Sequence, residues 1–191
     1  TLLRGLEVEP QQARKDDPRT GPLPNTKLYT HEGREVRFYD DLVRGKVVAI
    51  NCMYADCEGI CPMATENLLR VQERLGERAG RDVFMYSITL QPEHDSVDAL
   101  KHYAEMHGVK PGWLFLTGAP ADIRALRYRL GFYDPDPRVD GDRETHTGMV
   151  RIGNDLYDRW TMAPSLGGPD PILVTINHVD RAVVHTGLIQ T

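Results

Sequence analysis

Residues 46–62 read KVVAINCMYADCEGICP, and this stretch decides the fold. Its first seven residues form a near-continuous apolar, β-branched run, typical of a central strand that is buried on both faces. Pro62 is predicted to be the first residue of a helix that runs to Gly76, with Cys61 near its cap and Cys57 in the preceding loop. The sequence therefore predicts a Cys-x-x-x-Cys pair at a strand-to-helix junction, where open α/β sheets bind ligands.

Strands and helices alternate on both sides of this junction. Upstream, two short strands at 26–29 and 35–38 are predicted to form a hairpin. Downstream, apolar patterns predict strands at 83–90 and 113–116, helices at 97–106 and 122–130, an acidic loop at 133–145, a hairpin of 147–152 with 156–160, and a helix at 172–183. This order predicts an α/β domain with a mixed sheet that is covered by helices on both faces.

The composition is that of a single ordinary globular domain. The 191 residues carry a net charge of −5 and no Lys/Arg-rich stripe for phosphates, so we expect no nucleic-acid partner. The longest apolar run, 47–54, is too short to span a bilayer, and we expect no transmembrane segment in this sequence. Residues 1–24 are predicted to be an extended lead-in to a domain at 25–191. Since the first residue is Thr1, we expect any signal peptide or membrane anchor to lie upstream.

The spacing of the two cysteines bears on their chemistry. A helix start favours thiolate over thiol, which suits both a nucleophile and a metal ligand. Thioredoxin-type redox pairs have the spacing Cys-x-x-Cys, whereas three residues separate Cys57 from Cys61. The wider loop is better suited to holding two thiolates on one soft ion, and thiolates with an imidazole suit Cu(I), with Zn(II) as the competitor. A pair of merely structural cysteines is the remaining alternative.

These residues resemble the Sco/SenC family of copper-binding thioredoxin-like proteins. The resemblance runs from Gly45 through the Cys-x-x-x-Cys-Pro motif at 57–62. It continues in Gln-Pro-Glu-His-Asp-Ser at 91–96 and Trp-Leu-Phe-Leu-Thr-Gly at 113–118, and it ends in Glu-Thr-His-Thr at 144–147. It implies a thioredoxin-like mixed sheet flanked by helices, with an N-terminal β-hairpin and a late β-hairpin insertion.

The resemblance also implies a ligand set and a role. In that family two cysteines and a late histidine bind one copper ion, Cu(I) or Cu(II), and the matching positions are Cys57, Cys61 and His146. Many members assist assembly of the dinuclear copper centre of cytochrome oxidase. The implied partners are a copper-accepting client protein and a thiol-disulfide reductase. The implied location is extracytoplasmic, in the bacterial periplasm, with membrane anchoring through an upstream segment.

Two function classes follow from the motif. The first is a metallochaperone, which has metal ligands and no substrate pocket. The second is a thiol-disulfide oxidoreductase that uses Cys57 and Cys61 as its redox pair. The three-residue spacing and His146 favour the first class. This chain has Glu58-Gly59 and Gln91-Pro92 where the family commonly has Pro-Asp and Asp-Pro, and the resemblance does not extend to its segment from Thr161, so it resembles a divergent member.

Other chemically capable residues are interpreted as structural. Cys52, inside the predicted strand, is expected to be a small buried hydrophobe, and Met53 and Met63 are expected to fill gaps in packing. The remaining histidines have no spacing that indicates a second site. The acidic residues lack EF-hand spacing and are expected to lie in a mobile solvated loop that carries His146 toward the cysteines. They are Asp134, Asp136, Asp140, Asp142 and Glu144.

Overall fold

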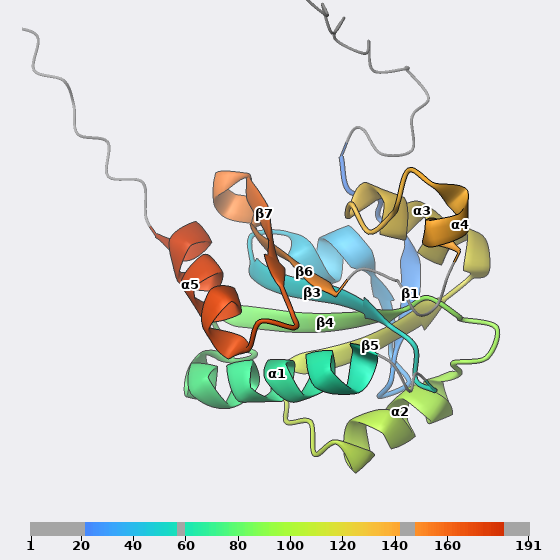
Figure 1. The fold of residues 1–191 in the computed structure, drawn as a ribbon, viewed down its shortest axis with the longest axis horizontal. Helices are drawn as coiled ribbons and strands as arrows, with labels where there is room; N and C mark the ends of the chain where they lie inside the picture. Colours follow the sequence, from blue (N-terminus) through green and yellow to red (C-terminus); the bar gives the residue numbers. More distant parts are fainter. Residues whose placement is uncertain (1–21, 57–59, 142–147, 182–191) are drawn as a thin grey trace, which may run out of the picture.

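The computed structural model describes residues 22–56, 60–141 and 148–181. These residues form a seven-stranded sheet in the order β2-β1-β5-β4-β3-β6-β7 (Figure 1). At its centre, β3 (Val47–Met53), β4 (Val83–Thr89) and β5 (Trp113–Gly118) run parallel. Two antiparallel hairpins extend it, β1 (Lys27–Thr30) with β2 (Glu35–Arg37) and β6 (Met149–Asn154) with β7 (Arg159–Pro164). The predicted mixed sheet is confirmed.

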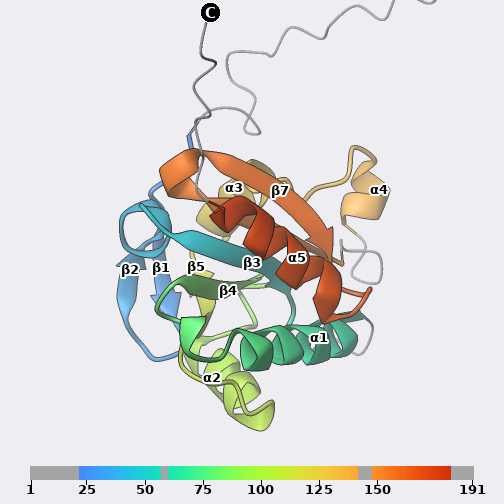
Figure 2. The same ribbon diagram turned by 90° about the vertical axis from the view of Figure 1, so that its left-hand side faces the viewer.

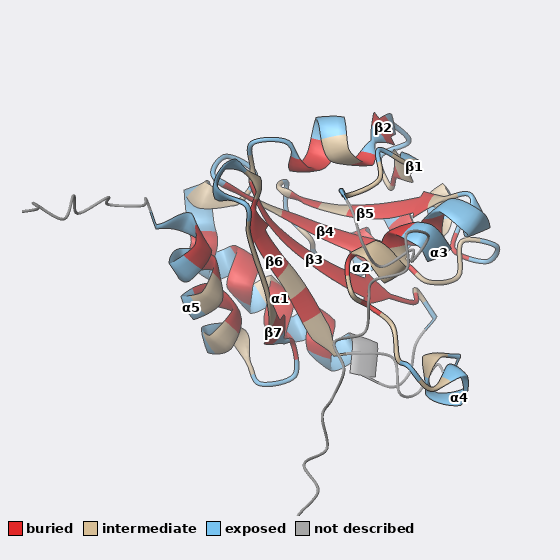
Figure 3. Cartoon of the chain, turned by 90° about the horizontal axis from the view of Figure 1, so that it is seen from above, coloured by how far each residue is buried: buried red, intermediate tan, exposed pale blue. Residues whose placement is uncertain are grey.

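Helices cover both faces of this sheet, as predicted (Figures 1 and 2). On one face, here called the α1 face, lie α1 (Ile60–Leu75), α2 (Val97–Met106) and α5 (Pro169–Asp180). On the other, the α3 face, lie α3 (Pro120–Arg129) and the helical turn η1 (Phe38–Val43). Figure 3 shows the strands buried between these layers. No described helix has the length and apolar content needed to cross a membrane.

Strand β3 is buried along its whole length, which confirms its predicted central place. Alternate side chains enter different cores, because successive residues of a strand point to opposite faces. Met53 contributes to the α1-face core, whereas Ile50 and Cys52 contribute to the α3-face core. The strand that leads to the cysteine motif is therefore fixed from both sides.

The buried Asn51 of β3 is satisfied by neighbouring strands. Its Oδ1 accepts a hydrogen bond of 2.6 Å from the Ser87 hydroxyl of β4. The same hydroxyl oxygen accepts a bond of 2.8 Å from the indole Nε1 of Trp113 on β5. Because buried polar groups are costly when unpaired, this three-residue network lets a polar side chain occupy the centre of the sheet.

Several predicted element boundaries are wrong. Helix α1 begins at Ile60, so Cys61 is helical and Pro62 is the third residue of the helix. The first turn of a helix has no intrahelical acceptors for its N–H groups, so a proline there loses no hydrogen bond. Helix α3 likewise begins at Pro120, two residues ahead of the predicted start. The predicted helix at 97–106 is confirmed as α2, and Ser96 caps it by accepting a hydrogen bond from the Ala99 N–H.

The late hairpin is also shifted from its predicted register. Its turn lies at Asp155–Asp158, and its second strand is β7 rather than residues 156–160. The Asn154 side chain accepts a hydrogen bond from the Leu156 N–H, and Asp158 adopts the left-handed conformation with φ of 48°. These two features make the turn, and Gly153 remains within β6.

Candidate metal centre

The chain segments that lead to the predicted ligands meet at one edge of the sheet. Strands β3 and β6 pair antiparallel, with Asn51 opposite Val150, so the end of β3 lies beside the start of β6. Helix α1 begins at the same edge (Figure 1). Cys57 and His146 lie outside the described residues, and so does the side chain of Cys61. The Cys57, Cys61 and His146 ligand set therefore stays a prediction. The geometry given below is that of the chain segments that flank these residues.

A buried carboxylate fixes the chain just ahead of Cys57. Asp95, which is 3% exposed, accepts a hydrogen bond of 3.1 Å from the Ala55 N–H. It accepts a second one of 2.5 Å from the hydroxyl of Thr89 at the end of β4. That hydroxyl oxygen in turn accepts from the Gln91 N–H. The segment after β3 is thus held to the segment after β4 by one side chain.

A second set of hydrogen bonds connects α1 to the start of β6. Asn67 of α1 is buried and donates from Nδ2 to the Ser165 carbonyl at 2.8 Å. The Ser165 N–H donates to the Gly148 carbonyl at 2.8 Å. Gly148 is two residues beyond His146, and Asn67 lies on the helix that contains Cys61. The elements that flank these two predicted ligands are therefore joined through Ser165.

The predictions for the nearby sulfur residues have mixed outcomes. Cys52 is 6% exposed in the α3-face core, on the side of the sheet opposite α1, so its interpretation as a buried residue is confirmed. Met53 is buried in the α1-face core, as predicted. The prediction for Met63 is wrong, because its side chain is 55% exposed and it shares the solvent-facing side of α1 with Glu66 and Arg70.

The described part of the acidic segment is ordered by its own hydrogen bonds. Residues 137–140 form the short helix α4 (Pro137–Asp140), capped by the Asp136 side chain. The Asp140 carboxylate pairs with Arg127 of α3, and it accepts hydrogen bonds from the Tyr128 hydroxyl at 3.3 Å and the Asp134 N–H at 2.8 Å. The loop prediction is therefore wrong for residues 137–140, which are helical, and the part-buried Arg127–Asp140 ion pair connects this segment to α3. Asp142 and Glu144 lie outside the described residues.

No alternative metal cluster is present in the described ranges. They contain no group of three or more His, Cys, Asp or Glu side chains that could hold a metal ion. The carboxylate of Asp136 caps α4 and pairs with Arg138, and that of Asp140 pairs with Arg127. Arginine partners thus occupy two of the carboxylates that a cation loop would have used.

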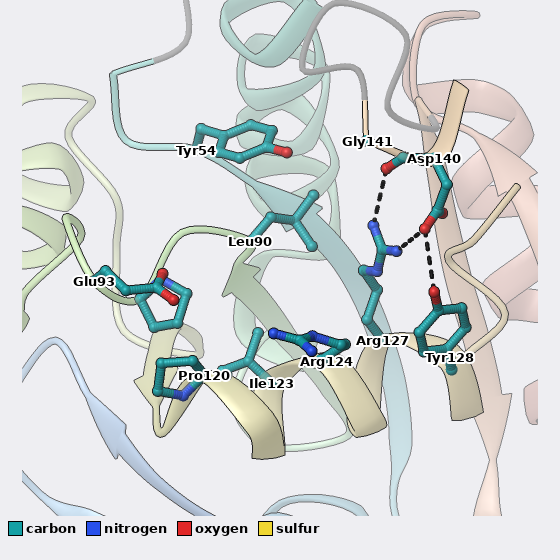
Figure 4. Close-up of a pocket in the computed structure, with 11 residues that line it drawn as sticks. Tyr54, Leu90, Glu93, Pro120, Ile123, Arg124, Arg127, Tyr128, Asp140 and Gly141 are labelled. Carbon is teal, nitrogen blue, oxygen red and sulfur yellow. Dashed lines mark hydrogen bonds and ion pairs between the residues drawn. The ribbon is translucent and has the colours of Figure 1, made fainter. Parts of the chain in front are cut away.

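Sequence reasoning missed a cavity beside the cysteine segment. The cavity measures about 320 Å³ and lies between the ends of β3 and β4 and helix α3 (Figure 4). Its lining includes Tyr54, three residues ahead of Cys57, and Gly141, five residues ahead of His146. Arg124 and Arg127 line it from α3, and their i, i+3 spacing was the one signal in the sequence that they share a helix face.

Comparison with known proteins gives consistent matches. A family model described as SCO1/SenC matches residues 24–155. The SCO1 protein homolog of Bacillus subtilis is 27% identical over 103 residues, and that match covers 53% of this chain but only 52% of the relative. The chain thus spans about half the length of this curated relative.

Solved structures share the fold. A SCO1/SenC family lipoprotein from Bacillus anthracis superimposes with a TM-score of 0.68 at 19% identity, covering 83% of this chain and 95% of that one. Copper-bound ScoI from Bradyrhizobium japonicum superimposes with a TM-score of 0.64 at 23% identity, covering 80% of this chain and 96% of that one. The predicted thioredoxin-like, Sco-type fold is confirmed.

Proposed function

This chain belongs to the SCO1/SenC family, and on that premise we propose that it is a metallochaperone that holds one copper ion through Cys57, Cys61 and His146. Copper is then its cargo, and the chemistry it performs is capture and release. The copper-bound state of ScoI from Bradyrhizobium japonicum supports the choice of metal.

The donor set suits copper on chemical grounds. Two thiolates and one imidazole are soft and borderline ligands, which Cu(I) prefers, and Zn(II) is the main competitor. Cys61 stands in the first turn of α1, where free backbone N–H groups and the helix dipole favour a thiolate. That turn, Ile60–Met63, contains no acidic residue that would oppose the thiolate. A thiolate is the form that binds metal, so the helix start assists loading.

One observation carries the proposal, the connection from Asn67 through Ser165 to Gly148. It ties the helix that contains Cys61 to the residue two positions after His146. Strand pairing of β3 with β6 brings the segment ahead of Cys57 to the same edge of the sheet. Three ligands that are distant in sequence need such rigid supports if they are to share one ion.

The client and the location are parts of the same proposal. A copper enzyme such as cytochrome oxidase is the client to which the ion is delivered, and a thiol-disulfide reductase keeps Cys57 and Cys61 reduced for loading. The lipoprotein character of the Bacillus anthracis structure supports an extracytoplasmic, membrane-anchored protein, with the periplasm as its site in bacteria. The copper-binding domain comprises residues 25–191, preceded by the lead-in at 1–24.

Metal titration of the reduced protein tests the proposal. One equivalent of Cu(I) should bind against a competing chelator, and Zn(II) should be displaced by it. Cys57→Ser and Cys61→Ser should abolish tight binding, whereas His146→Ala should weaken it about tenfold, or ~1.4 kcal/mol. Cys52→Ala removes a thiol from the opposite side of the sheet and should keep both stoichiometry and affinity. The Cu(II) form should show a thiolate-to-copper charge-transfer band.

The competing function is thiol-disulfide exchange by Cys57 and Cys61. Insulin reduction should be slow for the wild type, and His146→Ala should leave it unchanged, because exchange does not require the imidazole. Fast turnover in both proteins, with copper held no better than by a small dithiol, would contradict the chaperone and identify an oxidoreductase.

A further inference from the structure

The cavity beside the cysteine segment combines an apolar floor with a charged wall. Leu90 and the buried Ile123 form the floor, and the ring of Tyr54 stands over them (Figure 4). Pro92 lies on the side of the β4–α2 connection. A floor of this kind accepts one apolar side chain of moderate size, because burying such a group is favourable.

The charged wall comes from α3. The guanidinium of Arg127 is neutralised by Asp140, with both side chains largely buried. Arg124, one turn earlier, is exposed and lines the same cavity, and within the described residues it has no carboxylate partner. Figure 4 shows its guanidinium extending over Ile123, apart from the Arg127–Asp140 pair. The cavity therefore presents the Arg124 cation, which is unpaired among the described residues, above an apolar floor, and the exposed Glu93 carboxylate lines the opposite side, beyond Pro120 (Figure 4).

The place of the cavity indicates what kind of molecule would occupy it. Tyr54 precedes Cys57 by three residues, and Gly141 precedes His146 by five. A protein that approaches Cys57, Cys61 and His146 to receive copper would pass over this cavity. An exposed cation in a recessed site attracts a carboxylate, which guanidinium binds through charge-assisted hydrogen bonds.

We propose that this cavity is a recognition site for the client protein, and that it receives an Asp or Glu carboxylate on Arg124 and an adjoining apolar side chain on Leu90 and Ile123. This inference rests on the proposed delivery function, since the occupant is the copper-accepting partner. Such a contact sets the orientation of the two proteins and the rate of encounter, while the metal ligands hold the ion.

A capped dipeptide tests the site without copper. The reduced, copper-free, ¹⁵N-labelled protein is titrated with acetyl-Leu-Glu-amide and with the neutral acetyl-Leu-Gln-amide. We expect saturable shifts at the amides of Tyr54, Ile123 and Arg124 with the glutamate peptide, at a dissociation constant of about 1–10 mM. The glutamine peptide should bind about fivefold more weakly, because it lacks the charge-assisted contact.

Two variants make the test specific. Arg124→Gln should bind both peptides equally weakly, and because Arg124 is exposed the fold should be retained. Lys101→Gln removes an exposed cation from α2, on the other face of the sheet, and should behave as the wild type. Equal affinity for the two peptides, shifts centred elsewhere, or unchanged binding by Arg124→Gln would overturn the inference. Because copper is absent, such a result would leave the proposed metal binding unaffected.

Discussion

Replacing Asp95 with alanine should destabilise the protein and loosen the chain ahead of Cys57. Asp95 is 3% exposed, and its carboxylate is the acceptor for the Ala55 N–H and the Thr89 hydroxyl. Alanine leaves both donors without this acceptor. Thr89 is fully buried, so its hydroxyl does not reach bulk solvent from this position.

The magnitude follows from these two donors. An orphaned buried donor costs about 1–3 kcal/mol, and the Ala55 N–H is only partly buried, which places it at the lower end. Removing the buried carboxylate also removes its own desolvation cost, which offsets part of the loss. We therefore expect Asp95→Ala to lower the free energy of unfolding by about 1–3 kcal/mol. Asp95→Asn should lower it by less, because both donors bind the same carboxylate oxygen and the Asn amide oxygen can replace it.

Urea denaturation of the reduced, metal-free protein measures this loss, and amide hydrogen exchange at Ala55 reports the local effect. Exchange at Ala55 should accelerate more than exchange in the centre of β3. Asp98→Ala, three residues away at an exposed position of α2, is the matched control and should cost no more than about 1 kcal/mol, the loss of a favourable carboxylate in the first helical turn. A loss below about 1 kcal/mol for Asp95→Ala would refute the inference that the Asp95 carboxylate holds the segment ahead of Cys57 in place.

Two further predictions concern other parts of the fold. Burial lowers the pKa of His31 from its usual 6.5, and its Nδ1 accepts the Phe115 N–H, so the neutral form stabilises the fold. This stability should be complete above about pH 6.5 and fall as the pH drops toward the lowered pKa, and His31→Gln should flatten that part of the unfolding curve measured against pH. In Gly153→Ala the added Cβ would lie 2.1 Å from the Trp160 ring, and urea denaturation should show a loss of about 1–3 kcal/mol. Gly167→Ala, where a Cβ meets only ordinary contacts, should change stability far less, and equal losses in the two variants would contradict this reasoning.

The central strands could be predicted from the sequence because burial alone determines them. A seven-residue apolar run such as 47–53 has no stable place other than the middle of a covered sheet. The late hairpin was misplaced because Leu156 and Tyr157 have the composition of a strand, while the turn depends on the side chain of Asn154. Such a turn is decided by one local hydrogen bond, which hydrophobic patterning does not register.

In the candidate site, too, local features could be predicted from the sequence and long-range contacts could not. The cysteine motif is local, so its position after β3 and at the start of α1 could be predicted from spacing. The hydrogen bond from the Ala55 N–H to Asp95 joins residues 40 positions apart in the chain. The hydrogen bond from Asn67 to Ser165 joins residues 98 positions apart. The cavity likewise draws its lining from the ends of several elements. Only the pairing of the strands in three dimensions brings these residues together. The residue types alone do not indicate which strands will pair.

The sheet also separates two hydrophobic cores, so substitutions in one core have little effect on the other. Its two cores share no helix, since α1, α2 and α5 pack on one face and α3 on the other. Substitutions that lie far apart and share no partners have nearly additive effects, so the energetic consequences of altering α3 stop largely at the strand backbones. A lineage can therefore remodel the surface formed by α3 while the packing beneath the cysteine-bearing helix stays intact. Divergence of the α3 surface and retention of the packing around α1 are, in this architecture, separable evolutionary events.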